Sequence, residues 1–326
     1  MSDILADYRS AEVSYFAFAR HAIVEALRRS GVGHGDRVAL PGFICRDVLA
    51  SIAVLGAEPL FYDVNEMLRP SSLDHVPPAK AIIAVDYFGF AQDLAPFRAY
   101  CSRTNARLIE DNAHGLFSRD ERGDLLGLRG DFGTLSLRKA FHVSSGAALL
   151  DTQGTGISMP CIERGEGAHA LRFALSRFER RTRIPAFAAM RATIRTARRL
   201  IGKPAIDVGS TDDETQLPAA MAIGCRALER LNQQDADAER NRRRALFDRV
   251  AADLRGTPHV RLLHDHLDDF VVPYGVPFRY DGPGLPTLRA IERRHHVVVM
   301  QWPALPTAIA GSAPAHYRNV WLVNFL

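Results

Sequence analysis

One lysine and one acidic residue stand out as side chains that could do chemistry together. The segment EDNAH, residues 110–114, puts Asp111 at the end of an apolar run, and the segment GTLSLRK, residues 133–139, ends in Lys139. A lysine amine can hold an aldehyde covalently as a Schiff base, and a carboxylate can keep a ring nitrogen protonated. The pair is therefore typical of an enzyme that uses pyridoxal 5'-phosphate (PLP).

Lysine is scarce in this chain, which sharpens the prediction for Lys139. Of the 41 basic residues only Lys80, Lys139 and Lys203 are lysines, so few side chains could form the covalent link. Two plainer interpretations stay open at this point. Lys139 could be an ordinary surface lysine, and Asp111 could be an acid at a strand end that caps a helix.

The composition is ordinary for a globular enzyme. The chain has 326 residues, 47% hydrophobic and 24% charged, enough for one large α/β domain plus a smaller one. No stretch approaches the roughly 18 unbroken apolar residues of a membrane helix, and no signal peptide is expected at the N-terminus. The net charge of +4 is mild and decides nothing by itself. We expect small-molecule substrates and neither a nucleic-acid nor a membrane partner.

The four cysteines predict a reduced, cytoplasmic protein. They are widely scattered and form no C-x-x-C pair, and they lie at Cys45, Cys101, Cys161 and Cys225. Such spacing is typical of free thiols and not of a zinc site or a disulfide framework.

The first half of the chain alternates predicted helices and strands. Helices are expected over residues 20–30, 46–55 and 97–105, and strands over 38–41, 58–62, 81–85 and 106–110. This order predicts an α/β fold with a mostly parallel, seven-stranded sheet and crossover helices. The glycine-rich run at 31–35 precedes a strand and does not link a strand to a helix, which argues against a dinucleotide loop.

The second half carries different patterns. Residues 164–203 interleave arginines with apolar residues and are interpreted as a solvated, amphipathic helical insertion. The alternatives for this insertion are contact with an anionic substrate or a partner subunit, and binding to a membrane surface. A long helix is expected over 217–254, and strands of a small α+β domain over 271–278 and 297–302. The metal-capable run at 264–269 (HDHLDD) is not expected to bind a metal.

Several stretches, taken in order, resemble a known family. The chain resembles the DegT/StrS-type sugar aminotransferases, a branch of the fold-type-I PLP enzymes of the aspartate aminotransferase superfamily. The similarity covers most of the chain and is strongest over residues 35–150. The matching stretches are GDRVALP (35–41), GAEPLFYD (56–63), YFGF (87–90), EDNAH (110–114), GDFG through Lys139 (130–139) and QWP (301–303).

The resemblance implies roles for individual residues. Lys139 would form the Schiff base and shuttle a proton between the donor Cα and the cofactor. Asp111 would pair with the pyridine nitrogen, and His114 would lie near the phenolic oxygen of the cofactor. Ser136 would hydrogen-bond the phosphate.

The chain departs from the family pattern around the cofactor. Where the family has a small phosphate-binding turn with a hydroxyl residue, this chain has Ala19, with a free backbone N–H, and Arg20, whose charge could serve instead. Cys45 stands where many members place an aromatic residue on the ring face, and Phe43 is the nearest substitute. The resemblance also implies a large PLP-binding domain over 1–234 and a small C-terminal domain over 235–326 that is shorter than usual.

The implied reaction moves an amino group from an amino acid, expected to be glutamate, to a keto group on a nucleotide-linked sugar. The family also implies a homodimer with an active site shared between subunits. Two alternatives remain. The chain could be a non-catalytic homologue that acts as a partner subunit. It could also be a PLP-dependent sugar dehydratase, although such relatives replace the lysine by histidine and this chain keeps Lys139.

Overall fold

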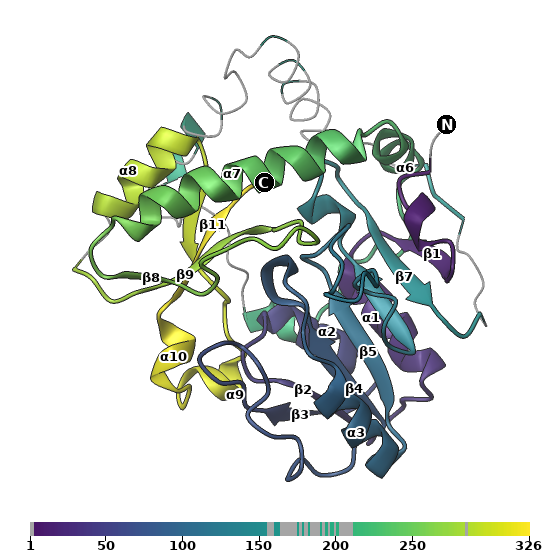
Figure 1. Ribbon diagram of the computed structural model, residues 1–326. Helices are drawn as coiled ribbons and strands as arrows, with labels where there is room; N and C mark the ends of the chain where they lie inside the picture. Colours follow the sequence, from purple (N-terminus) through teal and green to yellow (C-terminus); the bar gives the residue numbers. More distant parts are fainter. Residues whose placement is uncertain are drawn as a thin grey trace.

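The computed structural model describes residues 3–154, 160–163, 211–283 and 286–326, together with isolated residues between 175 and 201. Most of the arginine-rich segment 164–203 therefore lies outside the described residues, and so does the test of its predicted helical insertion. The described chain forms two β-sheets, and the long helix α7 (Ala236–Arg255) passes across the smaller one (Figure 1).

The larger sheet has seven strands in the order β1-β7-β6-β5-β4-β2-β3. The strands from β6 to β3 pair in parallel, and β7 is antiparallel to both of its neighbours. This arrangement confirms the predicted α/β fold with a mostly parallel sheet. The strands are β1 (Glu12–Phe16), β2 (Arg37–Pro41), β3 (Glu58–Tyr62), β4 (Ala81–Val85), β5 (Arg107–Asn112), β6 (Phe132–Leu135) and β7 (Ala147–Asp151).

Helices pack on this sheet because their apolar faces match buried strands. All five residues of β4 are buried, as expected for a parallel strand covered on both sides. The predicted apolar face of helix α1 (Ala19–Arg29) is buried as well, with Ile23 and Leu27 at most 1% exposed. The helix expected over 46–55 is a 3-10 turn (Arg46–Val48) followed by α2 (Leu49–Ala53), and α3 spans Ala95–Thr104.

The smaller sheet has four antiparallel strands in the order β10-β11-β9-β8. They are β8 (Val260–Leu262), β9 (Gly275–Tyr280), β10 (Val298–Gln301) and β11 (Val320–Asn324). Helices α7 and α8 (Pro286–His295) accompany this sheet, and the short helices α9 (Thr307–Ala310) and α10 (Ala315–Arg318) follow β10. The division of the chain at residue 234 into two domains stays a prediction.

The single long helix expected over 217–254 is wrong in its extent. The structure has α6 (Cys225–Asn232) and then α7, which begins at Ala236. The physical reason is a helix cap: the side chain of Asp235 accepts a hydrogen bond from the backbone N–H of Ala238 and starts a new helix.

The cysteine prediction is wrong for two of the four residues. Cys161 and Cys225 form a disulfide, with their Cα atoms 5.0 Å apart, whereas Cys45 and Cys101 are free. The pairing arises because Ile162 forms a parallel β-bridge with Gly224, which brings the two neighbouring cysteines together. Sequence spacing alone carries no signal of this contact.

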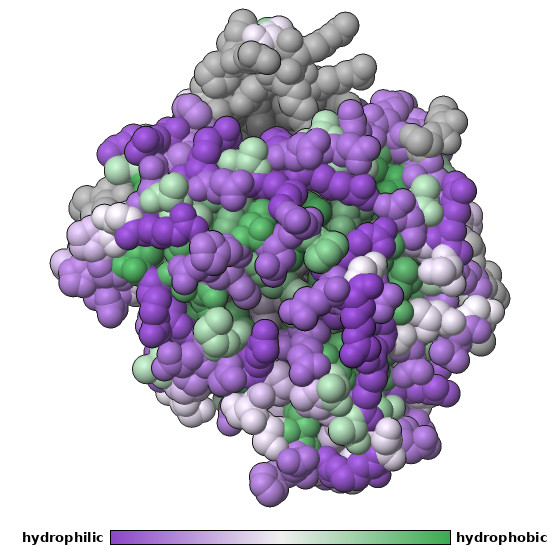
Figure 2. Space-filling model, viewed as in Figure 1, coloured by the Kyte–Doolittle hydropathy of each residue, from purple (hydrophilic) through white to green (hydrophobic). Residues whose placement is uncertain are grey.

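The face of the molecule shown in Figure 2 is mainly polar, as the composition of the chain leads us to expect. Hydrophilic side chains cover most of the face seen in Figure 2, and apolar side chains are visible mainly beneath α7. Within the described residues, no helix is both long enough and apolar enough to cross a membrane.

Candidate active site

The two motifs found in the sequence meet at one edge of the larger sheet. Asp111 lies near the end of β5, and Lys139 lies in the 3-10 turn Leu137–Lys139 that follows β6. The two strands are parallel neighbours, with Asp111 opposite Thr134 in the register. The carboxyl ends of adjacent parallel strands share an edge, which is the usual place for a ligand in an α/β sheet. The fold therefore brings the predicted residues together.

His114 contacts Lys139 directly. The Nζ atom of Lys139 lies 3.0 Å from Nε2 of His114, and the backbone N–H of Phe88 donates to Nδ1 of the same ring at 3.3 Å. His114 is 7% exposed. Burial, and then the positive charges of Lys139 and Arg243, hold its pKa well below the ordinary value, so the imidazole is neutral.

The hydrogen bonds of this neutral ring determine which protonation state of Lys139 can form a hydrogen bond with it. A neutral imidazole has one N–H, and because Nδ1 accepts from Phe88, the proton lies on Nε2. Nε2 then donates to Nζ of Lys139, which must accept. An ammonium group has no lone pair and cannot accept. The contact is a hydrogen bond when Lys139 is the free amine, the nucleophilic form of lysine, whereas the ammonium form places its charge beside the ring and so lowers the His114 pKa.

Aromatic side chains hold the His114 ring in place. It stacks on Phe88, with ring centroids 5.7 Å apart, and on Tyr274, at 4.5 Å, in both cases nearly parallel. The ring of Trp302 meets it edge-on at 5.3 Å. Phe88 has φ of +59°, a conformation that bulky residues rarely adopt and that commonly marks a functional turn. The stack is thus built on a strained turn after β4.

Asp111 is a buried carboxylate with one oxygen left over. Its Oδ1 accepts from the backbone N–H of Ala113 at 3.1 Å and from the hydroxyl of Thr134 at 3.2 Å. Burial raises its pKa, and the charge of Lys139 opposes that effect. No described residue hydrogen-bonds Oδ2. A buried anion with a vacant acceptor suits a cationic N–H partner, as a protonated pyridine nitrogen would be.

Two arginines gather at the N-terminus of α1. The residue before this helix, Phe18, provides no capping side chain, so the first backbone N–H groups have no side-chain acceptor. Arg20 forms an ion pair with Asp47 at 3.5 Å. The guanidinium of Arg138 lies 4.6 Å from the Phe18 ring centroid, and among described residues it has no carboxylate partner.

This arrangement can hold an anion. Burial, and then repulsion from Arg20, lower the pKa of Arg138, and the opposing effects of Tyr274 and Asp47 are smaller. Backbone N–H groups at a helix N-terminus and guanidinium groups are both favourable partners of phosphate. Arg138 was not predicted as a site residue. The signal available was its position next to Lys139.

The other predicted residues occupy different environments. Ser136 is 5% exposed and precedes the turn that carries Lys139. Its carbonyl accepts a hydrogen bond from the backbone N–H of Lys139. Phe43 is fully buried, and its ring packs against Tyr87 and Trp302 in the aromatic core. Cys45 lies close enough to Lys139 for its charge to act on the thiol, but burial dominates and raises the thiol pKa to about 12. Cys45 is therefore a neutral thiol.

Residues from the second half of the chain complete the surroundings. Tyr274, Trp302 and Arg243 line or cover His114 and Lys139, and of the three only Trp302 lies in a stretch that carried the family resemblance. A cavity of about 10 Å³ is lined by residues that include His114, Lys139, Glu239 and Arg243. This volume is room for at most one water molecule, so the cavity is no ligand site.

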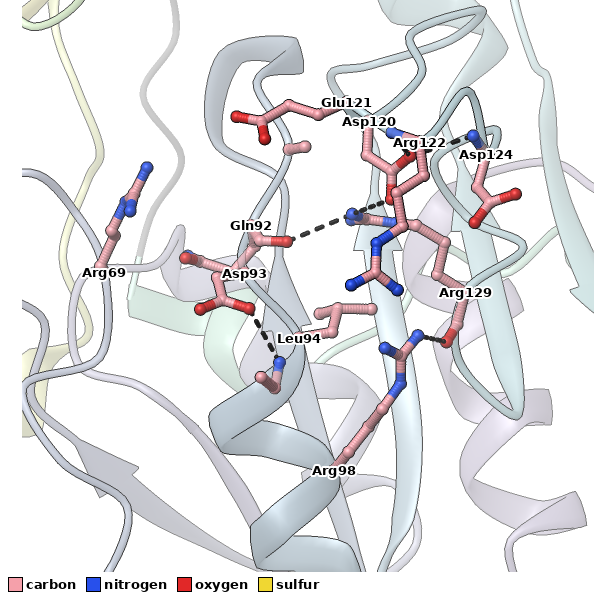
Figure 3. Close-up of a pocket in the computed structure, with 12 residues that line it drawn as sticks. Arg69, Gln92, Asp93, Leu94, Arg98, Asp120, Glu121, Arg122, Asp124 and Arg129 are labelled. Carbon is pink, nitrogen blue, oxygen red and sulfur yellow. Dashed lines mark hydrogen bonds and ion pairs between the residues drawn. The ribbon is translucent and has the colours of Figure 1, made fainter.

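A larger hollow, of about 340 Å³, lies elsewhere on the molecule and contains none of the predicted site residues (Figure 3). Its lining balances four arginines, Arg69, Arg98, Arg122 and Arg129, against four acids, Asp93, Asp120, Glu121 and Asp124. Because the charges balance, this hollow favours neither an anion nor a cation.

Comparison with known proteins identifies the segment that carries these residues. Residues 10–148 match the model of the DegT/DnrJ/EryC1/StrS aminotransferase family. An L-glutamine:2-deoxy-scyllo-inosose aminotransferase from Streptoalloteichus tenebrarius is 32% identical over 132 residues, which are 38% of this chain and 30% of the relative. The chain thus spans about a third of the length of the curated relatives it matches.

Solved structures extend the likeness of the fold to nearly the whole chain. The aminotransferase TlmJ from Streptoalloteichus hindustanus superposes with a TM-score of 0.61 at 17% identity, covering 98% of this chain and 84% of that one. A candidate sugar aminotransferase from Streptococcus pneumoniae, in its PLP form, gives a TM-score of 0.65 at 16% identity and covers 98% and 83%. At such identities the likeness concerns the fold. Asp111, His114 and Lys139 all lie in the segment, residues 10–148, that matches the model of the DegT/DnrJ/EryC1/StrS aminotransferase family.

Proposed function

We propose that this protein is a PLP-dependent aminotransferase that moves an amino group from glutamate to a keto group on a nucleotide-linked sugar. The observation that carries the proposal is the 3.0 Å contact between Lys139 Nζ and His114 Nε2, beside the buried carboxylate of Asp111. The contact is a hydrogen bond when Lys139 is the free amine, and a free amine is what attacks an aldehyde.

The residues present fit PLP at three points. Lys139 would bind its aldehyde carbon, the vacant Oδ2 of Asp111 would face the ring nitrogen, and Arg138 with Arg20 at the N-terminus of α1 would bind the phosphate. When bound, PLP supplies an electron sink for the carbanion at the donor Cα. The two guanidinium groups would also compensate for the hydroxyl residue that this chain lacks next to Ala19, because they supply hydrogen-bond donors and positive charge for the phosphate.

Each of the three central side chains has a task that its environment supports. Lys139 would take the proton from Cα of the amino donor and return it on the acceptor side. His114 would keep the amine of Lys139 oriented through its Nε2–H, because the aromatic stack prevents the ring from turning. Asp111 would remain charged while its partner is cationic, since an opposite charge offsets the cost of burying the carboxylate.

The curated relative named above uses L-glutamine and a cyclic ketone that carries no nucleotide. That observation favours a second candidate reaction, in which the donor is glutamine and the acceptor is a cyclitol ketone. An assay that pairs each donor with each acceptor separates the two, because glutamate yields 2-oxoglutarate and glutamine yields its own α-keto acid. We further propose that the protein acts as a homodimer in the cytoplasm, which sedimentation and cell fractionation would test.

The first experiment is covalent trapping of PLP. Purified protein is mixed with PLP, reduced with borohydride and mapped by peptide mass. We expect the label on Lys139 in the wild type and in Lys80→Ala, the matched control at an exposed lysine, and no label in Lys139→Ala. If saturating PLP labels no lysine of the wild type, the proposal is wrong and the partner-subunit alternative takes its place.

A further inference from the structure

We propose that Arg243 of helix α7 is a positioning residue for Lys139, because it holds the backbone of the turn that carries this lysine. The inference rests on the proposed function in one respect: it takes Lys139 as the reactive amine. Arg243 lies 104 positions further along the chain and on another element.

The contacts of Arg243 converge on the lysine turn. Its Nη2 donates to the carbonyl of Lys139 at 2.8 Å and to the carbonyl of Ala140 at 3.3 Å. Its Nη1 donates to the carbonyl of Pro273 at 3.2 Å. The 3-10 turn Leu137–Lys139 ends here, so these carbonyls have no helical N–H to accept from. Arg243 satisfies them and thereby fixes the main chain on which Lys139 stands.

A buried acid fixes Arg243 in turn. Its Nε donates to Oε1 of Glu239, one turn earlier on α7, at 2.8 Å, and the two side chains are 3% and 2% exposed. Burial works against the charge of Glu239, but hydrogen bonds from Arg242 and the charge of Arg243 outweigh it and lower the Glu239 pKa to about 2. The guanidinium is therefore locked by its acid on one side and offers its fork of donors on the other.

The same side chain reaches the wall of the site. The guanidinium carbon of Arg243 lies 6.0 Å from the ring centroid of Tyr274, whose ring stacks on His114. Arg243 thus ties the lysine turn to the segment that covers His114. If the Arg243 contacts are removed, the turn that carries Lys139 can shift relative to Tyr274. A displacement of about 1 Å at a reacting group can cost about 100-fold in rate.

The test compares Arg243→Met with Arg244→Met. Arg244 is the matched control because it is the next residue on the same helix and also donates to backbone carbonyls, those of residues 268, 269 and 271. The measurement is the rate at which PLP becomes covalently attached to Lys139, trapped with borohydride. We expect a decrease of about 100-fold for Arg243→Met and a change within about threefold for Arg244→Met. Arg243→Lys should fall between the two, because it keeps the charge without the fork.

A second measurement does not depend on PLP. Trace acetylation of the cofactor-free protein labels its few lysines, and the exposed Lys80 serves as an internal standard. We expect the ratio of Lys139 to Lys80 labelling to fall in Arg243→Met and to stay unchanged in Arg244→Met. If wild-type Lys139 takes up no PLP, the proposed function fails, and this ratio alone still decides the role of Arg243.

Removal of Arg243 leaves Glu239 with less compensation and could prevent folding. The double variant Glu239→Gln/Arg243→Met removes both buried charges and is far less costly to the fold than removal of one partner. It should show the same slow attachment and the same lower labelling ratio. The inference is overturned if either variant attaches PLP at the wild-type rate with an unchanged Lys139 to Lys80 ratio.

Discussion

Arg129→Met removes a cation that balances two fully buried carboxylates next to the candidate active site. The Nη2 atom of Arg129 lies 2.8 Å from Asp86 Oδ1 and 2.6 Å from Glu110 Oε1, and both acids are 0% exposed. Glu110 also accepts from Nε and from the backbone N–H of Arg129. Glu110 immediately precedes Asp111 on β5, so this cluster supports the strand end that carries the candidate site.

The magnitude follows from what the substitution leaves behind. Breaking a buried ion pair by removing one partner costs about 3–5 kcal/mol, because the remaining charge has no compensation. A domain is stable by only about 5–15 kcal/mol, so the variant should unfold at a much lower urea concentration. Arg107→Met is the control: Arg107, the first residue of β5, pairs with Asp131 at 3.1 Å, but the two side chains are 54% and 23% exposed. An exposed pair of this kind contributes at most about 1 kcal/mol.

The loss should also depend on pH, with a definite sign. Burial, and then repulsion from Glu110, already raise the pKa of Asp86 well above its usual value, and Arg129 opposes this effect. Without Arg129 the folded protein holds the Asp86 proton more tightly than the unfolded chain, so its stability falls as the pH rises above the unfolded pKa of about 3.9. Urea unfolding should therefore show a larger difference from wild type at about pH 7 than at about pH 4.5. A loss below about 1 kcal/mol, equal at both pH values and equal to that of Arg107→Met, would refute this account.

Three further predictions concern the turn after β4, the imidazole and the thiols. Gly89→Ala should destabilise the protein by about 2 kcal/mol more than Gly123→Ala, measured by urea unfolding: both glycines have positive φ, but an added Cβ lies 2.7 Å from a backbone carbonyl at Gly89 and meets nothing within 4 Å at Gly123. The His114 ring should show no NMR titration near the usual midpoint of about pH 6.5, because burial lowers its pKa; a midpoint there would contradict its neutral state. In denaturant without reductant, thiol titration should find two reactive thiols and not four, since Cys161 and Cys225 are bonded.

Local sequence signals were sufficient to predict that Asp111 and Lys139 of the candidate site lie close together. Asp111 follows a buried strand, and Lys139 follows the next strand along the sheet, so the topology of parallel strands brings them to one edge without further information. The break between α6 and α7 had a signal too, the N-cap residue Asp235, but the surrounding charged helical pattern obscured it. The predicted roles of Ser136 and Phe43 stay predictions.

The contacts made by α7 could not be predicted in the same way. Four arginines stand close together at its start, and the sequence makes them look alike. In the fold Arg240 pairs with Asp7, Arg242 pairs with Glu239, and only Arg243 faces the lysine turn. Which arginine faces inward depends on the rotation of the helix against the sheet, and tertiary packing sets that rotation. The same holds for the disulfide, which depends on a bridge between distant segments.

The site therefore combines two levels of information. The larger sheet carries the proposed pair of Lys139 and Asp111, and the smaller sheet with α7 supplies contacts around it: Tyr274 stacks on the His114 ring, and Arg243 donates to the carbonyl of Lys139. The reaction proposed for Lys139 requires its amine to be oriented toward the cofactor, and these contacts restrain the ring and the turn that orient it. Substitution of Lys139 should abolish PLP attachment altogether. Substitutions at Arg243 or Tyr274 should slow the attachment and leave Lys139 as the attachment point. If Lys139 reacted equally fast after Arg243 and Tyr274 were both substituted, the larger sheet alone would account for its reactivity.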